Sequence, residues 1–382
     1  MTRIGYDAKR IVRNATGLGN YSRTLVNDLS RTLPHDCEML LYTPDNGRDE
    51  LRSQVAVSER VRYVYPRRNG NPVTRGLWRS WGIVKDLRRD GVDLFHGLSG
   101  ELPIGIRAAG IPAVVTIHDL IFLRYPEYYN PIDVAIYKAK FLLTCREADR
   151  IIAISRCTAL DIVEFGGVDP KLIDIVYQSC GQRFATIASE EATESARLKY
   201  GLPARFILNV GTIEERKNLM LAAKALPYLP DDIHLVAVGR RTKYADRVDE
   251  WARRNNVAHR LHMLSGVDNT SLTAIYQMAE SFVYPSRYEG FGIPIIEAIQ
   301  SRLPVVAAKG SCLEEAGGPD CLYVDADNPE ELAVALKQTL RGAEFRDARI
   351  MRSREYVRRF ENRDTARQVE AIYSKCLGRK LV

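Results

Sequence analysis

The chain has 382 residues, of which 46% are hydrophobic and 27% are charged, a composition that excludes wholesale disorder and fibrous repeats. At about 150 residues per domain, this length indicates two or three domains. The net charge of +7 suits an anionic ligand or a membrane surface, but it is too small to indicate a nucleic-acid partner.

Short apolar runs bounded by Gly and Pro alternate with helical stretches along the whole chain. In the first half we expect strands at 3–7, 37–42, 61–65, 92–95, 113–117, 150–154 and 172–176, and helices near 19–33, 74–89, 133–148 and 156–165. In the second half we expect strands at 206–210, 234–238, 260–264, 281–284 and 304–307, and helices near 218–227, 243–255, 269–279, 292–301 and 329–341. This alternation is typical of βαβ units with parallel sheets. Two such series predict an α/β fold of two doubly wound, Rossmann-like domains.

The domain boundary is predicted near residues 178–203, after the last strand of the first series. We expect an N-terminal domain at 1–180, a linker at 181–203, a C-terminal domain at 204–362 and a final helix at 363–382 that returns to the first domain. The N-terminus reaches an acid too early for a signal peptide, and the seven scattered cysteines form no CxxC pair. These features predict reduced thiols in a cytoplasmic protein.

The most informative segment is 284–297, Tyr-Pro-Ser-Arg-Tyr-Glu-Gly-Phe-Gly-Ile-Pro-Ile-Ile-Glu. It is interpreted as a strand end, a glycine-bearing turn and a helix that begins near Gly292, with Pro294 in the first turn. The first amides of such a helix attract phosphate or a developing oxyanion. Glu289 precedes this helix start and Glu297 follows it, and a carboxylate can accept two hydrogen bonds from a diol.

Two adjacent cations, Arg216 and Lys217, follow the predicted strand at 206–210. A guanidinium and an ammonium at a strand end can neutralise a leaving diphosphate, whereas the alternative is a solvated helix start. Gly17 and Gly19 follow the first strand and precede a helix. They form a weak dinucleotide-binding pattern because Ser22 stands in place of a third glycine, and a plain tight turn is also open.

His118 and Asp119 end a strand of the first domain, where a functional side chain and a satisfied core histidine are both open interpretations. His96, at another strand end, is a weaker candidate. Lesser candidates stand at other strand ends of both domains: Ser155, Gly239, Arg240 and Ser265. Asp325 and Asp327 resemble a metal-binding pair, but their position before a helix indicates capping, so we expect no metal.

Glu289 and Glu297, with seven residues between them and Gly-Phe-Gly-Ile-Pro inside, resemble the signature of the retaining nucleotide-sugar glycosyltransferases of family 4. The resemblance implies the GT-B architecture, in which two Rossmann-like domains face a cleft. It places Glu289 on the donor sugar, Glu297 on the nucleotide ribose, and Arg216 and Lys217 on the donor phosphates. It also implies a donor contact for His118, a phosphate or acceptor contact for the glycine loop, and no cofactor or metal. The donor-binding amides would be those of Gly290, Phe291, Gly292 and Ile293.

The segment 121–129, Ile-Phe-Leu-Arg-Tyr-Pro-Glu-Tyr-Tyr, is similar to segments of bacterial mannosyltransferases of polysaccharide assembly. The resemblance therefore favours transfer of mannose from GDP-mannose to a growing glycan or a polyprenyl-linked acceptor. A UDP-hexose-dependent transferase and a non-catalytic nucleotide-sugar-binding protein stay open. The 74–89 helix carries Trp78, Trp81 and several cations, which suits either peripheral contact with the inner membrane surface or a half-buried helix.

Overall fold

The computed structural model describes residues 1–67, 71–360 and 362–381. The chain forms two compact units, Met1–Gln178 with Asn362–Val382, and Ser179–Glu361. Residues 181–203, expected to be a linker, lie in the second unit. Their helix α9 (Glu190–Tyr200) packs against α12 (Asn269–Met278), and the Ala188 amide donates to Gln277 Oε1 at 2.9 Å.

The first unit contains a seven-stranded parallel sheet in the order β3-β2-β1-β4-β5-β6-β7. The strands are β1 (Thr2–Asp7), β2 (Cys37–Tyr42), β3 (Val61–Val64), β4 (Leu94–Gly97), β5 (Ala113–Ile117), β6 (Arg150–Ala153) and β7 (Ile173–Ile175). The order changes direction between β1 and β4, as in a doubly wound fold.

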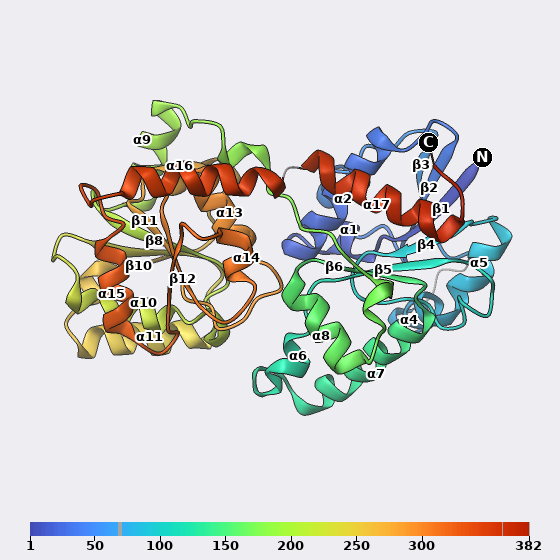
Figure 1. Cartoon of the computed structure of the whole chain (residues 1–382), viewed down its shortest axis with the longest axis horizontal. Helices are drawn as coiled ribbons and strands as arrows, with labels where there is room; N and C mark the ends of the chain where they lie inside the picture. The colour runs from blue at the N-terminus through green and yellow to red at the C-terminus, as the bar shows by residue number, and fades with distance from the viewer. Residues whose placement is uncertain (68–70, 361, 382) are drawn as a thin grey trace. The chain divides into compact units, whose positions relative to one another are not determined.

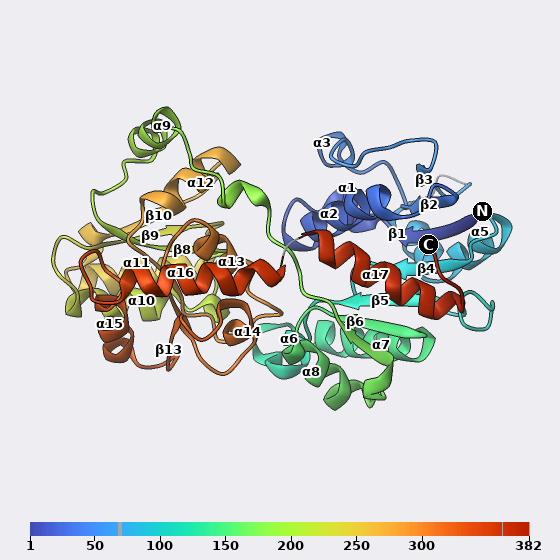
Figure 2. The same cartoon turned by 45° about the horizontal axis from the view of Figure 1, so that its top comes forward.

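Helices cover both faces of this sheet (Figures 1 and 2). They are α1 (Lys9–Arg13), α2 (Gly17–Thr32), α3 (Asp49–Arg52), α4 (Pro72–Leu77), α5 (Ile83–Arg89), α6 (Ile121–Arg124), α7 (Pro131–Glu147), α8 (Arg156–Gly166) and α17 (Asn362–Leu377). The helix expected at 74–89 is divided into α4, a π-helical turn at Trp78–Gly82 and α5. The last helix, α17, packs against α2 and lies beside β4 and β5 within the first unit (Figure 2).

The second unit contains a six-stranded parallel sheet in the order β10-β9-β8-β11-β12-β13. Its strands are β8 (Phe206–Val210), β9 (His234–Val238), β10 (Leu261–Leu264), β11 (Ser281–Tyr284), β12 (Val305–Ala308) and β13 (Leu322–Val324). Its further helices are α10 (Leu219–Ala225), α11 (Lys243–Arg254), α13 (Ile293–Gln300), α14 (Leu313–Gly317), α15 (Pro329–Lys337) and α16 (Arg346–Val357). The prediction of an α/β fold with two Rossmann-like domains is confirmed.

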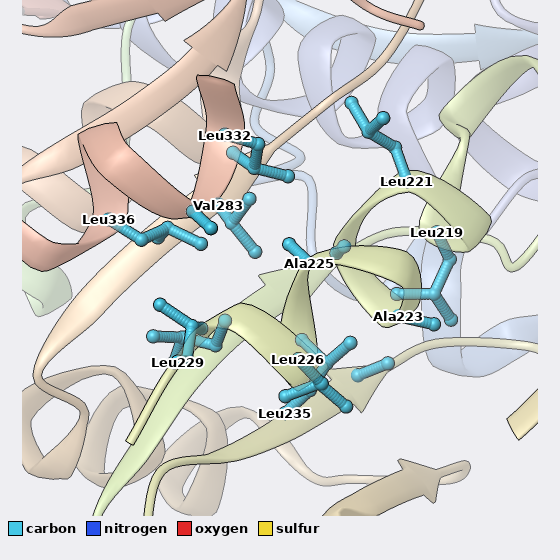
Figure 3. Packing of buried hydrophobic residues seen from close by; sticks show 14 of the residues in the cluster. Leu219, Leu221, Ala223, Ala225, Leu226, Leu229, Leu235, Val283, Leu332 and Leu336 are labelled. Carbon is cyan, nitrogen blue, oxygen red and sulfur yellow. The ribbon is translucent and has the colours of Figure 1, made fainter. Parts of the chain in front are cut away.

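The core of the second unit fixes the turn that precedes α10. Leu219, the first residue of α10, and Leu226, which directly follows α10, are buried in the core cluster that also contains Leu235 of β9 (Figure 3). Leu332 and Leu336 of α15 pack on the same core beside Val283 of β11. Because α10 is anchored at its first residue, the preceding turn 215–217 is held at the carboxyl end of β8.

None of the seven cysteines forms a disulfide within the residues that the structure describes, and four of them are buried. Within the described ranges, no helix is both long and apolar enough to cross a bilayer.

Candidate functional site

Arg216 and Lys217 lie on a single 3-10 turn, Glu215–Lys217, between β8 and α10. The next residue, Asn218, has a φ of 54°, a left-handed conformation that asparagine tolerates better than most side chains. Its Nδ2 donates to the Ala326 carbonyl at 2.8 Å. This sharp change of direction lets both cations lie beside the segment that follows β11.

The cations converge on one carboxylate oxygen, Oε1 of Glu289. Lys217 Nζ lies 2.6 Å from that oxygen, and Arg216 Nη1 lies 2.9 Å from it. Arg216 also pairs with Glu214 at 2.8 Å and donates to the Tyr288 carbonyl. The structure therefore brings Glu289 together with two cations that lie more than 70 positions before it, and the sequence analysis placed all three residues on the donor.

Two hydroxyl groups complete the surroundings of Glu289. Ser286 Oγ donates to Oε1 at 2.6 Å, and Tyr284 OH lies 3.2 Å from the same atom. Lys217 Nζ in turn donates to Tyr284 OH at 2.6 Å. The sequence analysis missed the roles of Tyr284 and Ser286, because nothing in the spacing shows that their hydroxyls reach this carboxylate.

Glu289 carries a negative charge across the physiological pH range. Burial raises the pKa of its carboxyl, but Lys217 and Arg216, together with the hydrogen bonds, outweigh burial and lower the pKa to about 2. A group with this pKa holds no proton to give near neutral pH. Glu289 can therefore accept hydrogen bonds from sugar hydroxyls or stabilise positive charge, but it cannot act as a general acid.

Helix α13 starts at Ile293, four residues after Glu289. Gly292 has a φ of 124°, which other residues rarely adopt, and a Cβ there would come within 3.1 Å of Ala316. Pro294 stands in the first turn, as predicted. The Cys312 thiol lies 3.0 Å from the Glu289 carbonyl and 2.9 Å from the Phe291 carbonyl. These contacts hold the 289–293 turn, whose last amides begin a helix and can attract an anion.

Glu297 lies in the second turn of α13. Its Oε2 accepts a hydrogen bond from Tyr276 OH at 2.9 Å. Burial raises the pKa of this carboxyl, while the Tyr276 hydrogen bond and the charge of Arg183 oppose the rise. Glu289 and Glu297 thus lie in different environments, as two residues with different roles would.

His118 lies at the end of β5 in the first unit and is 9% exposed. Its Nε2 lies 2.9 Å from the Leu98 carbonyl and must carry the proton, because a carbonyl can only accept. Nδ1 then accepts from the Gln178 amide at 2.9 Å. Burial lowers the pKa of His118 to about 4, so the ring is neutral at pH 7. A sugar hydroxyl that donates to Nδ1 would have to displace the Gln178 amide. The sequence analysis did not identify Gln178 as a neighbour of His118.

Other candidates of the first unit make local contacts. A Cβ on Gly19 would lie 1.7 Å from the Asn14 carbonyl, so the start of α2 requires glycine there, whereas Gly17 is exposed with open space around it. Asp119 Oδ1 accepts from the Ile121 amide at 3.3 Å. Ser155 is fully buried and caps α8 by accepting from the Thr158 amide at 2.9 Å. The cap accounts for this serine without a ligand.

Three lesser candidates of the second unit form one group at the ends of β9 and β10. Ser265 Oγ donates to the Gly239 carbonyl at 2.7 Å, and the Arg240 side chain is exposed. His96, by contrast, is wholly buried between Tyr373 OH at 2.7 Å and Thr116 Oγ1 at 2.9 Å. The interpretation of His96 as a ligand-facing residue is wrong, because the side chain is buried and both ring nitrogens are engaged, one by Tyr373 of α17 and the other by Thr116 of β5.

The acidic pair before α15 serves the fold. Asp327 pairs with Arg287, and Asp325 Oδ1 accepts from the Asp327 amide at 2.9 Å. The cap of α15 itself is Asn328, which accepts from the Glu331 amide at 2.9 Å. In the part of the chain that the structure describes, no group of three or more His, Cys, Asp and Glu side chains could hold a metal ion.

Known proteins resemble this chain both in sequence and in fold. The family model Glycosyltransferase Family 4 matches residues 15–179, and Glycosyl transferases group 1 matches residues 192–356. The O-antigen chain mannosyltransferase B of Escherichia coli is 26% identical over 372 residues, covering 90% of this chain and 92% of its own. The crystal structure of a glycosyltransferase from Rickettsia africae has a TM-score of 0.76 at 17% identity and covers 98% of each chain. Anabaena Alr3699/HepE in complex with UDP and glucose has a TM-score of 0.76 at 16% identity, covering 98% of this chain and 100% of that one.

The two Rossmann-like domains therefore define a glycosyltransferase of the GT-B fold class. The first family model contains strands β2 to β7 of the first sheet, and the second contains strands β8 to β13, the whole of the second sheet. The chain belongs to glycosyltransferase family 4.

Proposed function

We propose that this glycosyltransferase transfers mannose from GDP-mannose to a glycan acceptor with retention of the anomeric configuration and without a metal ion. The observation that carries the proposal is the convergence of Arg216 and Lys217 on Glu289, directly before the start of α13. Two cations and a helix start form a site for a diphosphate, and the adjacent carboxylate suits the hydroxyls of a sugar.

In the proposed reaction the two cations stabilise the charge that builds on the departing nucleoside diphosphate. Glu289 stays ionised and supports the positive charge that develops at the anomeric carbon. No described side chain beside Glu289 stands out as a nucleophile, so we favour departure and attack on the same face of the sugar. The leaving phosphate would then accept the proton of the acceptor hydroxyl. Because Nδ1 of the neutral His118 ring is a hydrogen-bond acceptor, it can accept a hydrogen bond from a hydroxyl group of the sugar.

The choice of mannose rests on likeness to O-antigen chain mannosyltransferase B, which covers most of both chains. A second donor class is kept because the similarly folded Alr3699/HepE was crystallised with UDP and glucose. A polyprenyl-linked acceptor and a location at the inner membrane surface are further parts of the proposal. Arg79 pairs with Asp7 and Glu101, and Trp78 donates to Asp86, so these two side chains of the basic aromatic segment have partners within the first unit and need no membrane.

The test is a donor screen with GDP- and UDP-sugars in the presence of EDTA, read by product mass and by the anomeric coupling constant in NMR spectra. We expect turnover of GDP-mannose with an α-linked product, and no loss of activity on chelation. If the protein turns over a UDP-hexose faster than GDP-mannose, the donor is that UDP-hexose and not GDP-mannose. Binding of a nucleotide sugar without turnover across an acceptor panel would favour the non-catalytic alternative.

A further inference from the structure

Tyr21 of α2 packs directly against His118 in the first unit. The two rings meet edge to face, with their centroids 4.6 Å apart and their planes at 85°. Leu98 and Gln178 bond the two ring nitrogens of the histidine, as described above. A histidine ring has a soft, roughly two-fold torsion about its Cβ–Cγ bond, and half a turn exchanges its nitrogens with its carbons. An aromatic ring packed against the imidazole at this distance opposes that rotation.

The hydroxyl of Tyr21 is the first member of a buried chain of hydrogen bonds. Tyr21 OH lies 3.1 Å from Thr116 Oγ1. Thr116 Oγ1 lies 2.9 Å from His96 Nε2, and His96 Nδ1 lies 2.7 Å from Tyr373 OH. The last three side chains are completely buried. The chain therefore runs from α2 through β5 and β4 to α17 without reaching solvent.

The middle of this chain is a neutral imidazole. Burial lowers the pKa of His96 to about 3, so at pH 7 one ring nitrogen donates and the other accepts. Such a ring satisfies one hydroxyl as donor and the other as acceptor. If Tyr21 moved away, the buried hydroxyl of Thr116 would lose one of its two partners. The chain therefore holds the Tyr21 hydroxyl in place.

The backbone that carries Tyr21 is fixed as well. Gly19, two residues earlier, lies so close to the Asn14 carbonyl that a Cβ would come within 1.7 Å of it. Arg23, two residues later and 3% exposed, donates to the Ile11 and Asn14 carbonyls at 2.7 and 2.9 Å. The glycine at position 19 thus lets α2 begin close against the end of α1, and this packing sets the position of Tyr21.

We propose that Tyr21 is a positioning residue for His118, whose imidazole it holds in one orientation while the buried chain anchors its own hydroxyl. The consequence for sugar transfer rests on the proposed function, in which Nδ1 of His118 accepts from a sugar hydroxyl. If the imidazole turned by half a turn, a carbon would replace Nδ1, and the hydroxyl would find no acceptor there. The packing of the two rings does not depend on the proposed function.

Long-range ¹H–¹⁵N NMR of protein labelled with ¹⁵N-histidine tests the positioning without any nucleotide sugar. The chain has six histidines, and His118→Gln identifies the signals of His118. In the unmodified protein at pH 7 we expect a single tautomer of His118, protonated on Nε2. In Tyr21→Leu we expect averaged signals of both tautomers, because a ring that turns freely loses the Leu98 carbonyl that selects Nε2.

The matched control is Tyr63→Leu. Tyr63 is partly buried on the same hydrophobic core as Tyr21, and its hydroxyl donates to the Arg52 carbonyl at 3.3 Å. This variant should leave the His118 tautomer unchanged. A single Nε2 tautomer in Tyr21→Leu would overturn the proposal. An equal change in Tyr63→Leu would also overturn it, because the cause would then be a general loosening of the core.

Tyr21→Phe keeps the ring and removes only the hydroxyl, so it decides the question if Tyr21→Leu does not fold. We expect the His118 signals of Tyr21→Phe to broaden through ring motion, with Nε2 still the main site of protonation. Signals identical to those of the unmodified protein would overturn the anchoring of Tyr21 by the buried chain.

Steady-state kinetics with GDP-mannose measure the consequence for transfer. Tyr21→Leu should lower kcat about 10- to 100-fold, the range expected when a reacting group is misplaced. Tyr21→Phe should recover part of this loss, and Tyr63→Leu should match the unmodified protein. An unchanged kcat in Tyr21→Leu would show that the orientation of His118 does not matter for transfer. If the unmodified protein transfers no sugar at all, the proposed function fails, while the NMR measurement still decides whether Tyr21 positions His118.

Discussion

Lys217 is the residue whose removal should most directly weaken catalysis. Its Nζ contacts both Glu289 Oε1 and Tyr284 OH at 2.6 Å, so its charge is held in place at the site. We expect Lys217→Met to lower kcat about 10²–10³-fold, the range found when one preorganised donor to a developing anion is removed. Steady-state kinetics with GDP-mannose measure the effect.

The matched control for Lys217 is Lys224→Met, because Lys224 is an exposed cation of α10 in the same unit. This variant should behave as the unmodified protein does. Comparable losses in the two variants would mean that the effect reflects general charge rather than a contact with the donor.

Glu289 offers a prediction in pH. Its pKa of about 2 lies below the ordinary value of 4.5, so the ionised form stabilises the folded state. This stabilisation is fully present above pH 4.5 and is lost as pH falls toward 2. Urea unfolding should therefore show a stability gap between the unmodified protein and Glu289→Gln that is constant above pH 5 and narrows below pH 4.5.

The same variant separates charge from proton transfer. Glu289→Gln should lower transfer, yet the pH profile of its residual activity between pH 5 and 9 should parallel that of the unmodified enzyme. A limb of the profile that disappears in Glu289→Gln would show that this carboxyl titrates during turnover, contrary to its ion pairs.

At the scale of elements, α17 is joined to the sheet of the first unit by a buried polar contact. Tyr373 OH lies 2.7 Å from His96 Nδ1, and burial lowers the pKa of His96 to about 3. Tyr373→Phe leaves a buried ring nitrogen without its partner, which costs about 1–3 kcal/mol of unfolding free energy. Urea denaturation measures this loss.

Tyr137→Phe is the corresponding control, since Tyr137 is 43% exposed on α7 and its change should stay within about 0.5 kcal/mol. A loss for Tyr373→Phe no larger than that of the control would show that the buried contact contributes nothing to the attachment of α17.

The helices and strands also show how much of the fold local sequence patterns can predict. All strands expected from apolar runs are present, and α13 begins where Gly292 and Pro294 predicted it. The pattern did not show the division of the 74–89 helix, where a π-helical turn lets Arg79 meet Asp7 and Glu101, partners 72 and 22 positions away.

The site shows the same division between local and distant information. Glycine spacing and paired acids identified Glu289 and Glu297, because helix starts impose local requirements on sequence. Lys217 donates to the hydroxyl of Tyr284, 67 positions later in the sequence, and His118 accepts from the amide of Gln178, 60 positions later. Such contacts depend on the order of the strands in the sheet, and the hydrophobic periodicity of a sequence does not predict that order.

At the scale of the whole molecule, the second unit consists of one continuous segment, whereas the first unit combines two segments that are far apart in the sequence. The core cluster of the second unit contains only residues between 207 and 340, whereas the core of the first unit includes Ala366, Val369, Ile372 and Tyr373 from α17. Burying a Val or Ile side chain contributes about 1.5–3 kcal/mol, so losing α17 removes much of the margin of a single domain. We therefore expect fragment 179–361 to fold alone and fragment 1–178 to stay largely unfolded.

Circular dichroism and thermal melts of the two fragments measure this difference, and ligand binding adds a second readout. If the diphosphate site lies in the second unit, GDP at 100 times its Kd should stabilise fragment 179–361 by about 2.7 kcal/mol, equivalent to roughly 5–10 °C in Tm. Lys217→Met in the same fragment should abolish most of this shift, while Lys224→Met should not. A folded fragment 179–361 that GDP fails to stabilise would show that the cations and the α13 start are insufficient to bind the nucleotide without the first unit.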